Sequence, residues 1–394
     1  MPSIEADRFT RVRYFTSAVS SAVPMDDSIL NSPVPLARPR GSSPIESRIT
    51  YGMYVRAIEE SLRITPNILA DTEAGLRVGS IDQFDEIRII AEKHGSDYHP
   101  ARLDLVSGST GYTFVLNVAV TERGRSRLPA EFSILRRLYE KFPLSFVPRV
   151  HALLEGSLAD GEGIRHPMLM FLGQWFEGYH EFHLSRVGRA GDLKVVLWDT
   201  EHGWKTLQPE EEGELHRLAA FILTYYFDTS DFSEIFPWHH AAGDFVAGFP
   251  DGHLDLKLIT VRGYEPRTDL TADTPVNAVY ALLAFFAGLT IRARLDRLDG
   301  VGEVVWAGRE CLTGSVRGFV DAMQEKVKTG SVQSSFLDAF FAQTRPMGPA
   351  DWAETFRDVV DSYDADAPDV PVIWDHLADH VLDVYKILKD FRLD

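Results

Sequence analysis

Apolar and polar residues alternate along the first half of the chain from Phe84 onward. Alternation with a period of two is typical of half-buried strands. It predicts five strands, at Ile87–Ala91, Ala101–Val106, Tyr112–Val120, Phe146–Leu154 and Met168–Trp175. Helical spacing of apolar residues predicts one helix before them, at Tyr51–Arg63, and one between the third and fourth strands, at Pro129–Lys141. We place Pro129 in the first turn of its helix, where a missing N–H costs least.

The second half of the chain changes to a period near 3.6, which is typical of amphipathic helices. Predicted helices follow at Glu210–Phe227, Asn277–Leu289, Gly314–Val327, Val332–Ala342, Pro349–Tyr363 and Val372–Leu388. Between the first two, Pro250-Asp251-Gly252 is a turn signal and Leu256–Val261 a short strand. A hairpin tip is predicted at Trp198–Trp204. The chain therefore reads as α+β, with its strands gathered mainly in the first half.

These patterns divide the chain into four segments. Residues 1–47 are rich in Ser, Pro and Arg, which predicts an irregular arm. Residues 48–83 form a helical extension, residues 84–178 a mostly-β domain, and residues 179–394 a mostly helical domain. The segment Phe15–Val23 follows three arginines, but acidic residues precede them and serines interrupt its apolar run. We therefore expect no signal peptide.

Composition narrows the class of protein. The chain has 394 residues, 45% of them hydrophobic, with a net charge of −18 and a single cysteine, Cys311. Negative charge argues against nucleic acid or an anionic membrane as partner, and one cysteine excludes an internal disulfide. The longest apolar stretches, Leu218–Phe227 and Ala278–Leu289, are shorter than the about 18–20 residues of a spanning helix. These features favour a soluble, cytoplasmic protein of undetermined oligomeric state.

The element order resembles that of a known superfamily over about residues 85–300. A small mostly-β lobe with one helix after its third strand, followed by a larger helical lobe, resembles the two-lobed protein-kinase-like fold. The aminoglycoside and choline phosphotransferases share this fold. The resemblance implies a nucleotide site between the lobes, with ATP and Mg²⁺ as cofactors of phosphoryl transfer.

Two positions correspond to the phosphate-binding ion pair of that superfamily. Tyr112–Val120 resembles the strand that carries the phosphate-gripping lysine, and Glu131 fits the glutamate that holds the lysine. The lysine position itself contains Asn117. An asparagine donates a hydrogen bond but carries no charge, so it does not neutralise phosphate. Glu131 is equally compatible with an ordinary carboxylate in a first helical turn, where the helix dipole favours it.

Two glycine-bearing turns correspond to the loop that covers the nucleotide phosphates. Gly95 and Ser96 lie between the first two strands, and the turn Gly108–Gly111 is an alternative. Close approach of backbone to phosphate favours residues without side chains, and each turn has fewer glycines than the superfamily pattern. A plain hairpin is the favoured interpretation of each turn. After the fifth strand, Phe176–Tyr179 resembles the hinge whose backbone binds adenine.

The catalytic loop is expected after the long helix. There Gly243 and Asp244 match the His-Gly-Asp motif of the phosphotransferases, whose aspartate orients or deprotonates the acceptor hydroxyl. Ala242 stands at the histidine position, and Phe249 at the position of a metal-binding asparagine. The metal-binding aspartate corresponds to Val261, or to Thr260 in a shifted register. Neither side chain offers the carboxylate oxygens that Mg²⁺ prefers.

The resemblance thus implies a kinase-like protein with degenerate catalytic residues, which binds a nucleotide or another small molecule between the lobes. An active atypical phosphotransferase and a non-catalytic interaction protein are the alternatives. A third alternative rests on His239-His240-x-x-x-Asp244, which resembles the HHxxxD motif of condensation-domain and chloramphenicol-acetyltransferase-type acyltransferases. There His240 would act as the base and Asp244 would be structural. A metal site formed with His253 and Asp255 is less favoured, because adjacent histidines on an extended segment point apart.

Overall fold

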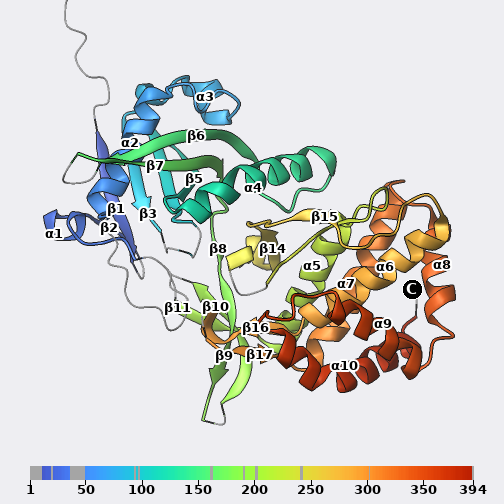
Figure 1. The fold of residues 1–394 in the computed structure, drawn as a ribbon. Helices are drawn as coiled ribbons and strands as arrows, with labels where there is room; N and C mark the ends of the chain where they lie inside the picture. The colour runs from blue at the N-terminus through green and yellow to red at the C-terminus, as the bar shows by residue number, and fades with distance from the viewer. Residues whose placement is uncertain are drawn as a thin grey trace, which may run out of the picture. The chain divides into compact units, whose positions relative to one another are not determined.

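The computed structural model describes residues 11–18, 21–35, 49–92, 95, 98–159, 163–189, 191–199, 203–239, 243–300 and 302–392. It is an α+β protein whose contacts divide it into two compact units, with the change of unit at Glu177–Gly178. Unit 1 comprises residues 1–141, 148–177 and 200–202. Unit 2 comprises residues 142–147, 178–199 and 203–394. Each unit is described separately below (Figure 1).

Unit 1 is built on a seven-stranded sheet with the strand order β2-β1-β3-β4-β5-β7-β6. Its strands are β1 (Val12–Ala18), β2 (Ser21–Pro24), β3 (Glu86–Ala91), β4 (Ala101–Ser107), β5 (Thr110–Ala119), β6 (Val150–Ala159) and β7 (Arg165–Gln174). The pairs are antiparallel except β1 with β3, which is parallel. The strands predicted at 87–91, 101–106, 112–120 and 168–175 are confirmed within two or three residues.

Helices cover both faces of this sheet. The helices of unit 1 are α1 (Asp27–Leu30), α2 (Tyr51–Ile64), α3 (Glu73–Val78), the 3₁₀ turn η1 (Ile81–Gln83) and α4 (Glu122–Lys141). Tyr54 and Ile58 of α2 share one buried cluster with alternate strand residues such as Leu116. On the other face, Phe132 of α4 contacts Phe171 of β7, with ring centroids 6.0 Å apart. Unit 1 is therefore a helix–sheet–helix layering with separate cores on the two faces.

Three predictions for unit 1 are wrong in detail. Residues 1–47 are not an irregular arm throughout, because β1 joins the sheet beside β3. The helix predicted from Pro129 begins at Glu122, and Pro129 lies inside it. Its start is fixed by Thr121, whose hydroxyl oxygen accepts from the Gly124 N–H at 3.1 Å. The fourth predicted strand begins at Val150, not Phe146.

Unit 2 combines small sheets with a helical bundle. Its strands are β8 (Tyr179–His180), β9 (Phe182–Val187), β10 (Asp192–Asp199), β11 (Gly203–Thr206), β12 (Ser233–Ile235), β13 (Phe245–Gly248), β14 (Asp255–Leu258), β15 (Tyr264–Pro266), β16 (Leu295–Arg297) and β17 (Val304–Trp306). Its helices are α5 (Pro209–Tyr226), α6 (Pro275–Arg292), α7 (Glu310–Lys328), α8 (Ser334–Thr344), α9 (Pro349–Asp361) and α10 (Val370–Asp390), with 3₁₀ turns η3 (Pro250–Gly252) and η4 (Leu298–Gly300). All six helices predicted for this half are confirmed.

Helices α5 and α7 form the closest helix pair in unit 2. Gly318 of α7 lies so near α5 that a Cβ built on it would be 2.0 Å from the carbonyl oxygen of Arg217. Lys326 of α7 is buried, and its Nζ donates to the carbonyl oxygens of Tyr225 and Phe227, each at 2.7 Å. These carbonyls lie at the C-terminal end of α5, where a cation is favoured by the helix dipole. Glycine contacts and this ammonium thus fix the pair.

Helix α6 supplies the centre of the bundle. Among the described residues it is the one helix long and apolar enough to cross a membrane by length and composition. Two-thirds of that stretch, 67%, is buried inside unit 2. Phe286 of α6 contacts Phe319, Phe340 and Trp352 from three other helices. This burial is the environment of a core helix, which is consistent with a soluble protein.

Candidate functional site

The loop before β13 carries the candidate catalytic residue Asp244. Trp238 is buried at the start of the loop and contacts Phe245 edge-to-face, with ring centroids 6.3 Å apart. Gly243 has φ +71°, a left-handed conformation that favours glycine. A Cβ on Gly243 would lie 3.2 Å from Oε1 of Glu181. The loop therefore turns at Gly243, close to the Glu181 carboxylate.

The Asp244 side chain is fully buried inside unit 2. Its Oδ2 accepts from the backbone N–H of His239 at 2.8 Å and from Nη1 of Arg262. Its carbonyl oxygen accepts from the N–H of Ile259 at 2.7 Å, just after β14. Oδ1 is buried and has no hydrogen-bond partner among the described residues. In this structure Asp244 ties the two ends of its loop to the segment after β14.

The charge on Asp244 is set by two opposing effects. Burial raises the pKa of the Asp244 carboxyl above its ordinary value, because removal from water disfavours the charged form. The Arg262 guanidinium and the His239 N–H lower it again, since both stabilise the carboxylate. Arg262 retains partial exposure, with 28% of its side chain accessible. The pair is thus a buried carboxylate held by a guanidinium that reaches the surface of unit 2.

A second arginine holds the other end of the loop. Arg292 at the end of α6 is 5% exposed, and its Nε and Nη2 donate to the Trp238 carbonyl oxygen at 3.2 and 3.1 Å. Its Nη1 donates to Asp369 at 3.2 Å, and its Nη2 lies 3.4 Å from the His239 ring. Burial, followed by the charges of the nearby arginines, lowers the pKa of His239 to about 2. His239 is therefore a neutral imidazole at neutral pH.

The two candidate phosphate-binding residues lie on one face of the unit 1 sheet. Asn117 on β5 pairs across the ladder with Phe171 of β7, so the two side chains point to the same face. Phe171 contacts Phe132, which follows Glu131 in α4. Glu131 is 3% exposed, on the side of α4 that is buried. The sheet face that carries Asn117 is thus the face that α4 covers with Glu131.

The predicted glycine turns have different outcomes. Gly95 lies between β3 and β4, and its N–H donates to the Tyr98 carbonyl oxygen at 2.9 Å. Ser96 lies outside the described residues. The alternative, Gly108, has φ +59° in the hairpin turn between the paired residues Ser107 and Thr110. Gly108 therefore serves a hairpin, which is the plain interpretation of that sequence.

The positions of the predicted metal ligands contain no metal-binding arrangement among the described residues. His240 lies outside the described residues. In the described part of the chain, no group of three or more His, Cys, Asp or Glu side chains could hold a metal ion. Val261 is fully buried, and the next residue is Arg262. Phe249, at the asparagine position, has the Lys205 ammonium 3.7 Å from its ring centroid.

The sequence analysis did not identify three residues that lie near Asp244 or its loop. Arg262 follows the predicted strand directly, and the pattern identified Val261 and Thr260 but not their charged neighbour. Arg292 ends an otherwise apolar helix, and a charge in such a position is a usable signal of a buried ion pair. Glu181 gave no signal, because only the fold brings it beside Gly243.

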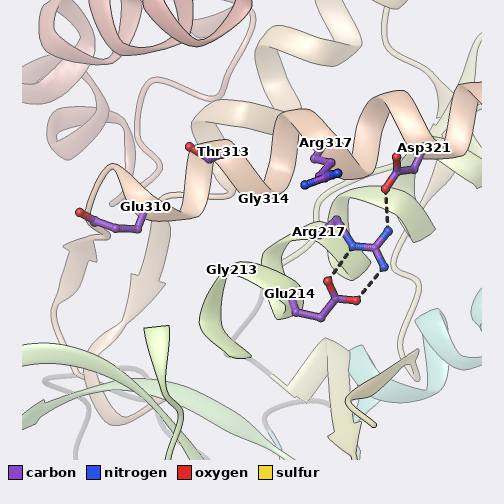
Figure 2. A pocket seen from close by; sticks show the side chains of 8 residues that line it. All are labelled: Gly213, Glu214, Arg217, Glu310, Thr313, Gly314, Arg317 and Asp321. Atoms are coloured by element: carbon purple, nitrogen blue, oxygen red, sulfur yellow. Dashed lines mark hydrogen bonds and ion pairs between the residues drawn. The ribbon is translucent and has the colours of Figure 1, made fainter. Parts of the chain in front are cut away.

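A recess lies elsewhere in unit 2, between α5 and α7 (Figure 2). Its volume is about 680 Å³. Figure 2 shows Arg217 between the carboxylates of Glu214 and Asp321, at 2.7 and 2.6 Å. Arg317 and Thr313 line the same recess from α7. Its acidic and basic groups are intermixed, so it does not favour a ligand of either charge.

The chain matches no protein-family model and no curated protein.

Proposed function

We propose that this chain is a kinase-like protein that does not transfer phosphoryl groups and instead binds a nucleotide or another small molecule. The proposal joins the resemblance of the sequence to features of each unit. Non-catalytic members of an enzyme fold retain the layering and lose the charged groups of the reaction, since function resides in sites placed on folds.

Strand order in unit 1 supports the kinase-like part of the proposal. Five neighbouring strands follow the order β3-β4-β5-β7-β6, and α4 connects β5, the third of these along the chain, to β6, the fourth along the chain. The resemblance implies one helix after the third strand, on the face that carries the lysine position. Asn117 and α4 share one face of the sheet. β1, β2 and α2 are additions for which the resemblance gives no counterpart.

The Asp244–Arg262 pair carries the non-catalytic part of the proposal. A catalytic-loop aspartate must accept from a substrate hydroxyl, which requires an oxygen within hydrogen-bond reach of that substrate. Oδ2 of Asp244 is already engaged by Arg262 and His239, and the whole side chain is buried. Arg262 also adds a positive charge beside the position where the resemblance implies a carboxylate for Mg²⁺. Such a charge opposes metal binding there.

Missing charges at Asn117 and at the metal-ligand position act in the same direction. Phosphoryl transfer depends on positioning and charge neutralisation, to which a lysine and Mg²⁺ contribute most. Asn117 supplies no charge, and neither Val261 nor Thr260 supplies a carboxylate. Loss of one such electrostatic contact typically lowers a rate about 10²–10³-fold, so the losses at Asn117, Phe249 and Val261 together remove useful turnover.

The test is a turnover assay on the full chain with ATP and Mg²⁺, with phosphate release or transfer as the readout. We expect no turnover above a protein-free control, and no effect of Mg²⁺ on any nucleotide-induced rise in melting temperature. Asp379 is an exposed aspartate on α10 and provides a matched control. Robust turnover that Asp244→Ala abolishes and Asp379→Ala preserves would overturn the proposal.

One observation favours a second candidate function. The HHxxxD resemblance implies a structural aspartate, and Asp244 is buried and held by Arg262. His240 would then be the base of an acyl transfer from a thioester donor. The assay follows release of free thiol from acyl thioesters in the presence of amines and alcohols. Thiol release that His240→Ala abolishes would favour this function, and its absence in the parent protein would remove it.

A further inference from the structure

Helix α4 differs in charge from the rest of the chain. Between Glu122 and Lys141 it carries six basic and three acidic residues, in a chain whose net charge is −18. One of the acidic residues, Glu131, is buried and does not contribute to the outer surface. The outward side of α4 is thus a basic surface on an acidic protein, and such a surface attracts anions from solution.

The basic residues near the end of α4 surround a recess. Its volume is about 400 Å³, and it is lined by Phe132, Ser133, Arg136, Arg137, Glu140 and Lys141. Arg136, Arg137 and Lys141 are exposed. Arg137 and Lys141 lie one turn apart on the same side of the helix. Together with Arg136 they present three cationic groups that can hold one anion from two or three directions.

The single exposed acid in the recess is a weak competitor. Glu140 accepts from Nε of Arg136 at 2.9 Å, but the two side chains are 61% and 62% exposed. Such exposed pairs contribute little net energy, because water and salt screen them. An anion with higher charge density can therefore displace Glu140 from Arg136.

The chemistry of the recess favours phosphate over carboxylate. Arginine presents a planar fork of donors that matches phosphate oxygens, and lysine adds a point charge that many phosphate sites use. A volume of about 400 Å³ holds a small molecule rather than a folded partner. The three cationic side chains lie within six residues of the helix, so a short molecule with several negative charges can contact all three. We propose that the Arg136–Arg137–Lys141 recess of α4 is a binding site for a short oligophosphate.

The experiment measures binding of inorganic tripolyphosphate to the full chain by calorimetry, at low salt and without divalent cations. The double variant Arg137→Gln/Lys141→Gln should lose at least about tenfold in affinity, since it removes two of the three cations. Affinity of the parent should also fall steeply with added salt. Glu140→Gln should bind about as tightly as the parent or more tightly, because it removes the competing carboxylate.

The matched control is Arg77→Gln on α3, an exposed arginine of unit 1 that also pairs with a glutamate one turn away, at 2.9 Å. It should bind like the parent. No binding by the parent, equal loss in the control, or unchanged binding by the double variant would each overturn the site. Tighter binding of a pentaglutamate peptide than of tripolyphosphate would overturn the choice of occupant. The readout is binding without turnover, so it is independent of the function proposed above.

Discussion

Replacement of Asp244 by asparagine separates a structural role from a catalytic one. The substitution keeps the size of the side chain and removes its charge. Oδ2 now accepts a charge-assisted bond from Arg262 and a second bond from the His239 N–H. In Asp244→Asn one of these donors would meet an amide NH₂, or the NH₂ would occupy the buried position of Oδ1, which has no hydrogen-bond partner among the described residues.

The expected loss follows from these contacts. A hydrogen bond to a charged group contributes about 1.5–3 kcal/mol net, and an unsatisfied buried donor costs about 1–3 kcal/mol. Two effects reduce the sum. First, Arg262 is 28% exposed, so in the variant water partly replaces its lost partner. Second, burial raises the pKa of Asp244, which means that the charged carboxylate is itself costly to keep in this buried position. We expect Asp244→Asn to lower the free energy of unfolding by about 1–3 kcal/mol.

The assay is urea unfolding followed by tryptophan fluorescence and circular dichroism, with Asp379→Asn as the exposed control. The control should change stability by less than about 0.5 kcal/mol. A double-mutant cycle with Arg262→Gln should give a coupling energy of about 1 kcal/mol or more, since the residues share a bond. If Asp244→Asn is as stable as the control and shows no coupling to Arg262, the structural role is wrong and Asp244 is available for chemistry.

Two further predictions concern the bundle of unit 2. Burial lowers the pKa of His380 to about 3, below its value in the unfolded chain. The stability that the neutral, buried imidazole provides is therefore present above pH 6.5. It is lost as the pH falls, because the unfolded chain takes up the proton first. Between about pH 6.5 and pH 5, protonation of this group alone should lower the free energy of unfolding by about 2 kcal/mol. In urea unfolding, the His380→Gln variant should lack that part of the pH dependence. Gly318→Ala places a Cβ 2.0 Å from a backbone oxygen of α5, and thermal unfolding should show a loss of about 1–3 kcal/mol or more. Gly213→Ala in the same helix pair meets nothing within 4 Å and should gain up to about 1 kcal/mol, so equal effects at the two glycines would contradict the packing argument.

Local patterns predicted most elements but not their long-range partners. The periods of two and 3.6 located the strands β3, β4, β5 and β7 and the helices of unit 2, because burial of one face imposes those periods. β1 was missed, since the β3 residues that pair with it lie 75 positions further along the chain and no local signal marks a parallel pairing. The start of α4 was misplaced because Pro129 suits a first turn, whereas the Thr121 cap fixes the start a full seven residues earlier.

The sequence located the segment of the candidate site but did not predict which residues surround it. The spacing after the long helix identified Gly243 and Asp244, which the structure places directly before β13. The contacts of this loop include Arg262, which donates to Asp244, and Arg292, which donates to Trp238, and the two arginines come from separate elements. Hydrogen-bond partners of that kind are set by tertiary packing, so a single sequence gives their residue types and not their pairing.

The parallel contact of β1 with β3 has a practical consequence for shorter versions of the protein. A chain that began after Met25 would lack β1 and β2 and would leave β3 at the edge of the sheet. The backbone donors and acceptors of β3 that now pair with β1 would then face solvent along the strand, which carries Ile87, Ile89 and Ile90. An open edge of this kind recruits strands from other molecules and promotes self-association. Strands β1 and β2 therefore protect the edge of β3 from pairing with other molecules, in addition to forming part of the sheet.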